Sequence, residues 1–130
     1  LNGYGIFIDL TGNASVFIAG AGGVNFNAPV ALNQWTHLAI VRNAGTWNMY
    51  VNGVSAPYVG GFPQTTAPNI PTTSFVIGNG EGESNPFSGQ IDEVRMYNSV
   101  RTPAQIQSDM SATTPNGAVG YWNFEETTGN

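Results

Sequence analysis

The chain has 130 residues, enough for one domain with a single core, and 41% of them are hydrophobic, which excludes a disordered chain. Only 8% are charged, there is no lysine, and the formal net charge is −5. Without clustered basic residues the surface is unsuited to nucleic acid, and without a long apolar run the chain is not expected to insert into a membrane. The absence of cysteine excludes disulfides and thiolate metal sites. With so few charges, the solubility of the chain must depend on Asn, Thr, Ser, Gln and Gly. Such a neutral polar surface is typical of secreted and cell-surface β proteins, so we expect an extracellular or cell-surface location.

Short runs of alternating apolar residues, bounded by turn residues, predict a series of strands. They are expected at Tyr4–Asp9, Ser15–Ala19, Trp35–Arg42, Thr46–Asn52, Ser74–Gly80 and Gly89–Asn98. The first two strands are joined through Thr11-Gly12-Asn13, and Asn43-Ala44-Gly45 forms a three-residue hairpin loop. Asn52-Gly53 signals a second tight turn, whereas the prolines of residues 60–74 predict a loop.

One helix is expected after the last of these strands. Thr102 is a suitable N-cap, Pro103 suits the first helical position, and Gln105 stands at the capping-box position. Ile106 and Met110 are four residues apart and so share one helix face, and the helix is expected to end near Met110. Many short strands with frequent turns predict an all-β, antiparallel sandwich with one short helix.

Two blocks of sequence resemble a known family. LNQWTHLAIVRNAGTWNMYVNGV and, about thirty residues later, GQIDEVRMYNSVRTPAQIQ are similar to the laminin-G-like, concanavalin A-like jelly-roll domains. The resemblance implies a jelly-roll β-sandwich. Domains of this family serve as binding or spacer modules in sialidases, glycanases, adhesins and surface-layer proteins, and some depend on calcium.

The C-terminal end resembles the opening strand of the same family. We expect residues 1–112 to form the sandwich without the family's first strands, residues 113–118 to be a linker, and residues 119–130 to form an aromatic strand. Its apolar side chains are Val119, Tyr121, Trp122 and Phe124. Such a strand is suited to cover an exposed sheet edge, either by folding back on its own domain or by adding to a neighbouring copy of the chain. A simple fragment of a longer protein is the alternative.

Oxygen-bearing side chains near the last strand suggest a calcium site. Alternation places Asp92 on the same face as Val94 and Met96, where a carboxylate needs a hydrogen bond or a metal. The preceding loop adds further oxygens that suit a hard cation, from Asn79, Glu81, Glu83 and Asn85. The resemblance implies the same, since some members bind calcium near one end of the sandwich. The alternative is that backbone N–H groups satisfy Asp92 and the loop acids are solvated.

The sequence lacks the usual signals of an enzyme. His37 is the single histidine, and we interpret it as a core residue rather than a ligand. Paired acids of a glycoside hydrolase would share one face, whereas alternation sends the adjacent Asp92 and Glu93 to opposite faces. No nucleophile with a matching base is evident either.

Aromatic side chains indicate a second class of function. Tyr58 and Phe62 flank a glycine pair, and together with Trp47 they are candidates for stacking on sugar rings. The leading hypothesis is a non-catalytic extracellular module of a repetitive or filamentous surface protein, acting in structure or adhesion and assembling through its C-terminal strand. The alternative is a carbohydrate-binding module, with or without calcium, of a secreted enzyme or adhesin.

Overall fold

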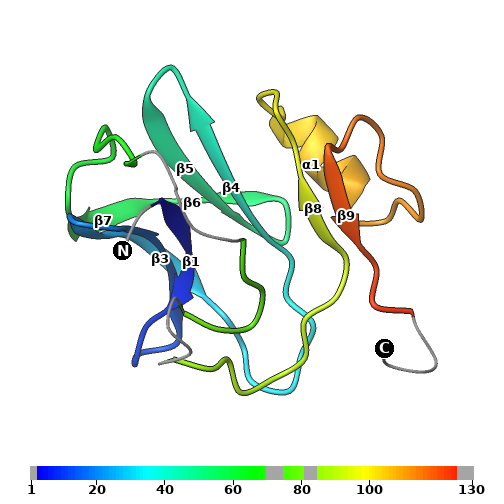
Figure 1. Ribbon diagram of the computed structural model, residues 1–130, viewed down its shortest axis with the longest axis horizontal. Coiled ribbons are helices and arrows are strands. Elements are labelled where there is room, and N and C mark those ends of the chain that lie inside the picture. The colour runs from blue at the N-terminus through cyan, green and yellow to red at the C-terminus, as the bar shows by residue number, and fades with distance from the viewer. Residues whose placement is uncertain (1–2, 70–74, 81–84, 126–130) are drawn as a thin grey trace.

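The computed structural model describes residues 3–69, 75–80 and 85–125, which form antiparallel sheets and one short helix (Figure 1). A four-stranded sheet has the order β1 (Tyr4–Ile8), β2 (Asn13–Ile18), β3 (Gly22–Pro29), β7 (Tyr58–Gly61). A three-stranded sheet contains β4 (Leu38–Asn43), β5 (Thr46–Val51) and β6 (Val54–Ala56). β8 (Val94–Met96) pairs with β9 (Gly120–Trp122), and α1 spans Pro103–Asp109. The predicted all-β antiparallel sandwich with one short helix is confirmed.

The core lies between the two larger sheets. Alternation along the strands sends every second side chain inward, from β2 and β3 on one side and from β5 and β6 on the other. The buried residues are Ala14, Val16, Ile18, Val24, Phe26, Ala28, Trp47, Met49 and Ala56. Trp47 is the largest of them. Its indole N–H donates to the carbonyl of Thr66 at 2.8 Å, and the Tyr4 ring lies 4.9 Å from its own ring.

Two tight turns shape the β4–β5–β6 sheet. Asn43 pairs with Thr46, so the first turn has the two central residues Ala44 and Gly45 and not the predicted three. Their φ angles are 46° and 83°, and a hairpin turn with two positive φ angles matches the right-handed twist of its strands. The second turn, predicted at Asn52-Gly53, is confirmed, with φ angles of 49° and 76°.

Several strand predictions were wrong in extent. β3 and β6 were not predicted, and β7 begins before the expected loop and includes its first two residues. β8 is shorter than the predicted Gly89–Asn98. Residues 75–80 form no strand, because Gly78 has a φ of 80° and its carbonyl accepts from the Phe87 N–H at 2.8 Å. That segment therefore turns back instead of extending.

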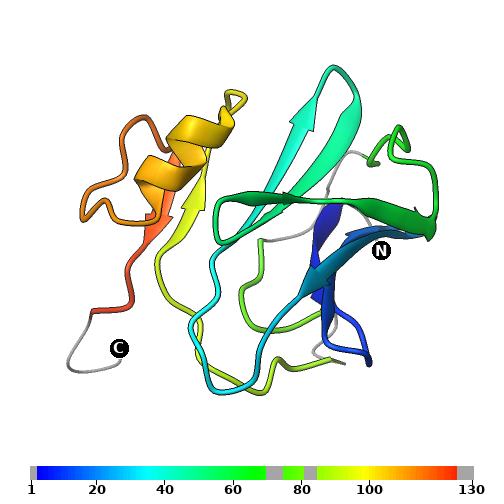
Figure 2. The ribbon, with the colours of Figure 1, turned by 180° about the vertical axis from the view of Figure 1, so that it is seen from behind.

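Helix α1 begins and ends as predicted. The Thr102 hydroxyl accepts from the Gln105 N–H at 3.3 Å, and the Gln105 side chain accepts from the Thr102 N–H at 2.8 Å. Ile106 is buried, and the Gln107 amide donates to the Gly53 carbonyl at 3.4 Å. A Cβ at position 53 would lie 2.8 Å from the Gln107 Cγ, so glycine there lets the helix rest on the β5–β6 turn. Figure 2 shows α1, β8 and β9 together at one end of the molecule, away from β1.

Candidate functional site

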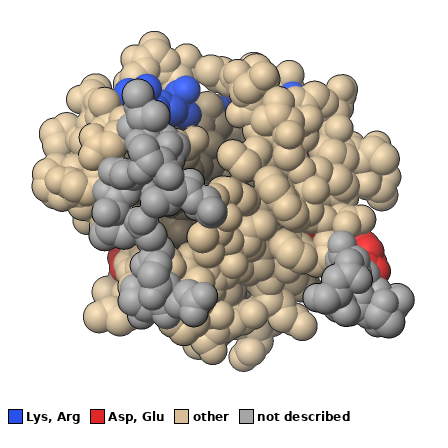
Figure 3. Space-filling model, in the orientation of Figure 1, with Lys and Arg blue, Asp and Glu red and all other residues tan. Residues whose placement is uncertain are grey.

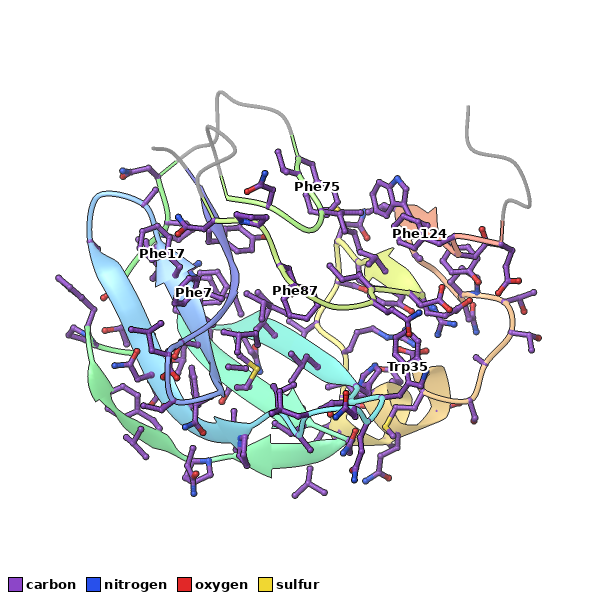
Figure 4. The ribbon with its side chains drawn as sticks, turned by 90° about the horizontal axis from the view of Figure 1, so that it is seen from below. Phe7, Phe17, Trp35, Phe75, Phe87 and Phe124 are labelled. Carbon is purple, nitrogen blue, oxygen red and sulfur yellow. The ribbon has the colours of Figure 1, made fainter. Side chains whose placement is uncertain are left out.

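A groove lies where four parts of the chain meet: the segment before β4, the β5–β6 turn, the segment before β8 and the end of α1. Its volume is about 430 Å³, within the range of roughly 300–1,000 Å³ that is usual for small-ligand sites. We call it the Trp35 groove, and its lining residues are Trp35, Thr36, His37, Asn52, Asp92, Glu93 and Met110. Trp35 is 67% exposed and lies beside α1 in Figure 4. The groove thus combines an open aromatic ring with several polar groups.

Asn52 ties the turn to the segment that carries Trp35. Its side-chain oxygen accepts from the backbone N–H of His37 at 2.9 Å, and its own backbone N–H donates to the His37 carbonyl at 2.8 Å. Residues 35–37 were predicted as the start of a strand, but β4 begins only at Leu38. Because Asn52 uses its oxygen internally, the amide NH₂ is the group with which it would meet a ligand.

Asp92 and Glu93 both line the groove, although alternation predicted that they face opposite ways. The difference arises because Glu93 has a φ of 54°, which breaks the alternation of the extended chain. The Asp92 Oδ1 atom accepts from the Glu93 N–H at 2.8 Å, in agreement with the alternative that a backbone group satisfies it.

The Glu93 side chain is held in place by two neighbours. Its Oε1 accepts from the Tyr121 hydroxyl at 2.7 Å, and its Oε2 accepts a charge-assisted hydrogen bond from Arg95. The hydrogen bond from Tyr121, with the Arg95 guanidinium, lowers the pKa of Glu93. Glu93 is therefore an ionised side chain whose acceptor atoms are already engaged.

His37 is half-buried at the groove, and its buried Nδ1 has no hydrogen-bond partner among the residues that the structure describes. Burial first, and the Arg95 charge second, lower the pKa of His37 from its ordinary value of 6.5, while Asp109 acts in the opposite direction. This histidine is thus neutral in the folded protein at pH 7.

That lowered pKa predicts a pH dependence of stability. As the pH falls below about 6.5, the unfolded chain takes up the His37 proton before the folded chain does, so the free energy of unfolding decreases. Replacing His37 with glutamine is expected to flatten this loss between about pH 7.5 and 5. Urea titrations of both proteins across that range measure it. Parallel curves for the two proteins would contradict the assignment to His37.

The predicted calcium ligands do not form a complete set in the described part of the chain. The Asn79 side-chain oxygen accepts from the N–H groups of Gly80 and Asn85, at 2.8 and 3.2 Å, so it serves its own loop. Glu81 and Glu83 lie outside the described residues. Within residues 3–69, 75–80 and 85–125, no three His, Cys, Asp or Glu side chains are close enough together to hold a metal ion. Calcium stays a prediction for this loop.

The predicted glycan-stacking residues fall into two kinds. Trp47 is only 1% exposed, so its ring is not accessible to a sugar, and this prediction was wrong because the strand turns Trp47 and not Tyr50 fully into the core. Tyr58 and Phe62 are 39% and 44% exposed, but they lie at β7 and do not line the Trp35 groove. The sequence interpretation missed Trp35, Asn52 and Met110.

The C-terminal strand folds back on its own domain. β9 pairs antiparallel with β8, with Tyr121 opposite Arg95 and Trp122 opposite Val94. The guanidinium of Arg95 lies 5.4 Å from the Tyr121 ring centre, and the Trp122 ring lies 5.0 Å from that of Phe75. Val119 and Phe124 are 62% and 45% exposed. Within the chain, this pairing brings Tyr121 to Glu93 at the groove.

Comparison with known proteins identifies the family. The family described as the concanavalin A-like lectin/glucanases superfamily, in its laminin G form, matches residues 2–107, which is most of the chain. A search of curated proteins and a search of solved structures each found no match. In the part of the chain that the structure describes, no helix is long and apolar enough to cross a membrane. The chain belongs to the concanavalin A-like lectin/glucanase superfamily.

Proposed function

We propose that this chain is an extracellular, non-catalytic module that binds neutral glycans in the Trp35 groove. The observation that carries the proposal is the 67% exposed Trp35 ring in a groove that also contains Asn52 and Asp92. Sugar rings have apolar C–H faces, which suit an indole, and hydroxyl edges, which suit an amide donor and a carboxylate acceptor. Membership of a superfamily of lectins and glucanases supports a carbohydrate-binding or adhesion role.

The charges at the groove favour neutral over acidic glycans. Asp92 and Glu93 bring carboxylates to its wall, and the chain has a formal net charge of −5. A sialylated or sulfated ligand would meet like charge, which raises the cost of binding. Among the residues that Figure 3 colours by charge, uncharged ones cover most of the displayed face, as expected of a surface that interacts through hydroxyl and amide groups. This composition also supports the extracellular location.

A binding role suits the groove better than glycan hydrolysis does. A glycosidase needs one carboxylic acid with a raised pKa to protonate the leaving oxygen. At this groove the pKa of Glu93 is lowered, by the Tyr121 hydrogen bond above all, and Arg95 occupies its second oxygen. The protein is therefore expected to retain a glycan on its surface, as an adhesion or targeting module does, and to leave it intact.

The experiment is a binding survey of the purified chain on a panel of immobilised glycans, with matched neutral and acidic members of the same backbone. Binding to neutral glycans that weakens when a sialic acid or sulfate is added is the expected result. Mass spectrometry of the glycans after incubation checks that none is cleaved. Binding restricted to acidic glycans, or no binding to any member, would contradict the proposal.

Calcium gives a separate prediction. Because none of the groove contacts requires a metal, a chelator is expected to leave glycan binding unchanged. If Asp92, Asn79, Glu81 and Glu83 hold calcium as the sequence predicts, the chelator lowers the melting temperature, since a ligand that binds the folded state stabilises it. Thermal melts with calcium and with chelator measure this. An unchanged melting temperature would remove the predicted metal site, and loss of glycan binding would contradict a metal-free groove.

A further inference from the structure

The docking of β9 on β8 is small and specific. β9 has only 3 residues, and in the described part of the chain these two strands form a sheet of their own. A two-stranded sheet is marginally stable by itself. Side-chain contacts add to the stability of the strand pair: the Tyr121 hydroxyl donates to Glu93, the Arg95 guanidinium lies over the Tyr121 ring, and Trp122 contacts Phe75.

The segment that leads to β9 is tied only at its two ends. At one end, Arg95 donates hydrogen bonds to the carbonyls of Asp109 and Ala112. At the other end, the Val119 N–H donates to the Met96 carbonyl at 2.8 Å. Between them, residues 113–118, which the structure describes in full, make no backbone–backbone hydrogen bond outside regular elements. This segment is able to change direction without loss of internal hydrogen bonds.

Apolar side chains around the two strands remain open to solvent. Val119, Trp122 and Phe124 are 62%, 36% and 45% exposed, and Phe75 and Met96 are 56% and 37% exposed. Figure 4 shows Phe75 and Phe124 both on the upper side of the view. These five exposed apolar side chains lie beside short sheet edges. A cluster of this kind marks a surface for contact with another protein chain.

We propose that β9 exchanges between two copies of this chain, so that the β9 strand of each copy pairs with β8 of the other. A second copy fits this edge because its β9 carries the same Tyr121 and Trp122 and makes every contact that the intrachain strand makes. Exchange of an identical element is a low-cost route to a dimer, since the contacts it breaks are formed again. The close approach of two β8–β9 sheets also covers part of the exposed apolar surface.

The exchange has a consequence for the Trp35 groove. Tyr121 holds Glu93 at the groove wall, so in the exchanged dimer each groove is completed by a tyrosine from the other copy. Two grooves are then fixed in one particle, which raises the avidity for a surface that presents many glycans. The dimer itself requires no glycan, and it is tested without one.

The absence of cysteine makes disulfide trapping a clean test. Met96 pairs with Gly120 across the two strands, and a Cβ built at Gly120 lies 3.6 Å from the Met96 Cβ, within the roughly 3.5–4.5 Å of a disulfide. The same Cβ would lie 2.8 Å from the far edge of the Trp122 ring, so this partly exposed ring must rotate to admit the new side chain. One chain carries Met96→Cys and a second, distinguished by mass, carries Gly120→Cys. The two are mixed at high concentration, oxidised and resolved by mass. A third chain with both substitutions reports the pairing within one molecule.

The expected result is a disulfide dimer between the two different chains in clear excess over dimers of either chain with itself. Adding Tyr121→Ala to the Gly120→Cys chain, which removes the hydroxyl that donates to Glu93 and the ring that Arg95 contacts, is expected to abolish that excess. The exchange would be overturned by two observations together. Mixed dimers would form at no more than the statistical proportion, and the double variant would form its disulfide only within single molecules.

Discussion

Replacing Trp47 with alanine is expected to lower the free energy of unfolding by about 3–5 kcal/mol, as is usual for loss of a buried tryptophan. Trp47 is 1% exposed, and three partners depend on it: the Thr66 carbonyl at 2.8 Å, the Tyr4 ring at 4.9 Å and the Arg42 guanidinium at 5.5 Å. A domain of this size has a total stability of about 5–15 kcal/mol, so the loss is a large part of it. Urea titration followed by circular dichroism measures the change.

A milder substitution separates packing from hydrogen bonding at this position. Trp47→Phe keeps an aromatic ring in the core but leaves the Thr66 carbonyl without the indole N–H. We expect it to cost less than Trp47→Ala and still to be destabilising, because a partly buried acceptor loses its partner. If Trp47→Ala unfolded at the same urea concentration as the original protein, the position of Trp47 between the two sheets would be wrong.

Replacing Trp35 with alanine is expected to weaken glycan binding by about 2 kcal/mol or more, roughly thirtyfold, because a central aromatic side chain dominates the energy of such a contact. Its effect on stability should be within about 0.5 kcal/mol, since Trp35 is 67% exposed. Isothermal titration with a glycan taken from the panel, and urea titration of the same samples, measure both quantities.

Tyr58→Ala is the matched control for Trp35→Ala. Tyr58 is 39% exposed, lies on the four-stranded sheet and does not line the groove. We expect it to leave glycan affinity unchanged. The opposite pattern, in which Tyr58→Ala abolishes binding and Trp35→Ala does not, would place the ligand on the predicted Tyr58–Phe62 surface and contradict the assignment to the Trp35 groove.

The parts of the fold that the sequence predicted are those with local signals. The helix follows from Thr102, Pro103 and Gln105, which lie within four residues of one another, and Thr102 and Gln105 form hydrogen bonds with each other. The turn at Asn52-Gly53 follows from the two residue types that best tolerate positive φ. β3 was not predicted, although the alternation of Val24, Phe26 and Ala28 is a local signal typical of a strand.

The candidate site escaped prediction because it depends on contacts between distant segments. Trp35, Asn52, Asp92 and Met110 come together only after the sheets and the helix have packed. The backbone at Glu93 adopts a positive φ that alternation does not anticipate, and its side chain is held by Tyr121 from β9. Similarly, the two faces of β5 are both aromatic, at Trp47 and Tyr50, so only the position of the opposite sheet decides which ring is buried.

The most direct test of the glycan-binding account uses the three tryptophans of the chain. In a ¹H–¹⁵N nuclear magnetic resonance spectrum their indole N–H groups give separate signals, which single substitutions assign. Trp35 lies in the groove, Trp47 in the core and Trp122 on β9. On titration with a neutral glycan that the panel identifies, we expect the Trp35 signal to shift in a saturable manner while that of Trp47 stays in place. A saturable shift of Trp122 alone, or binding that leaves Trp35 unmoved, would show that the Trp35 groove is not the site.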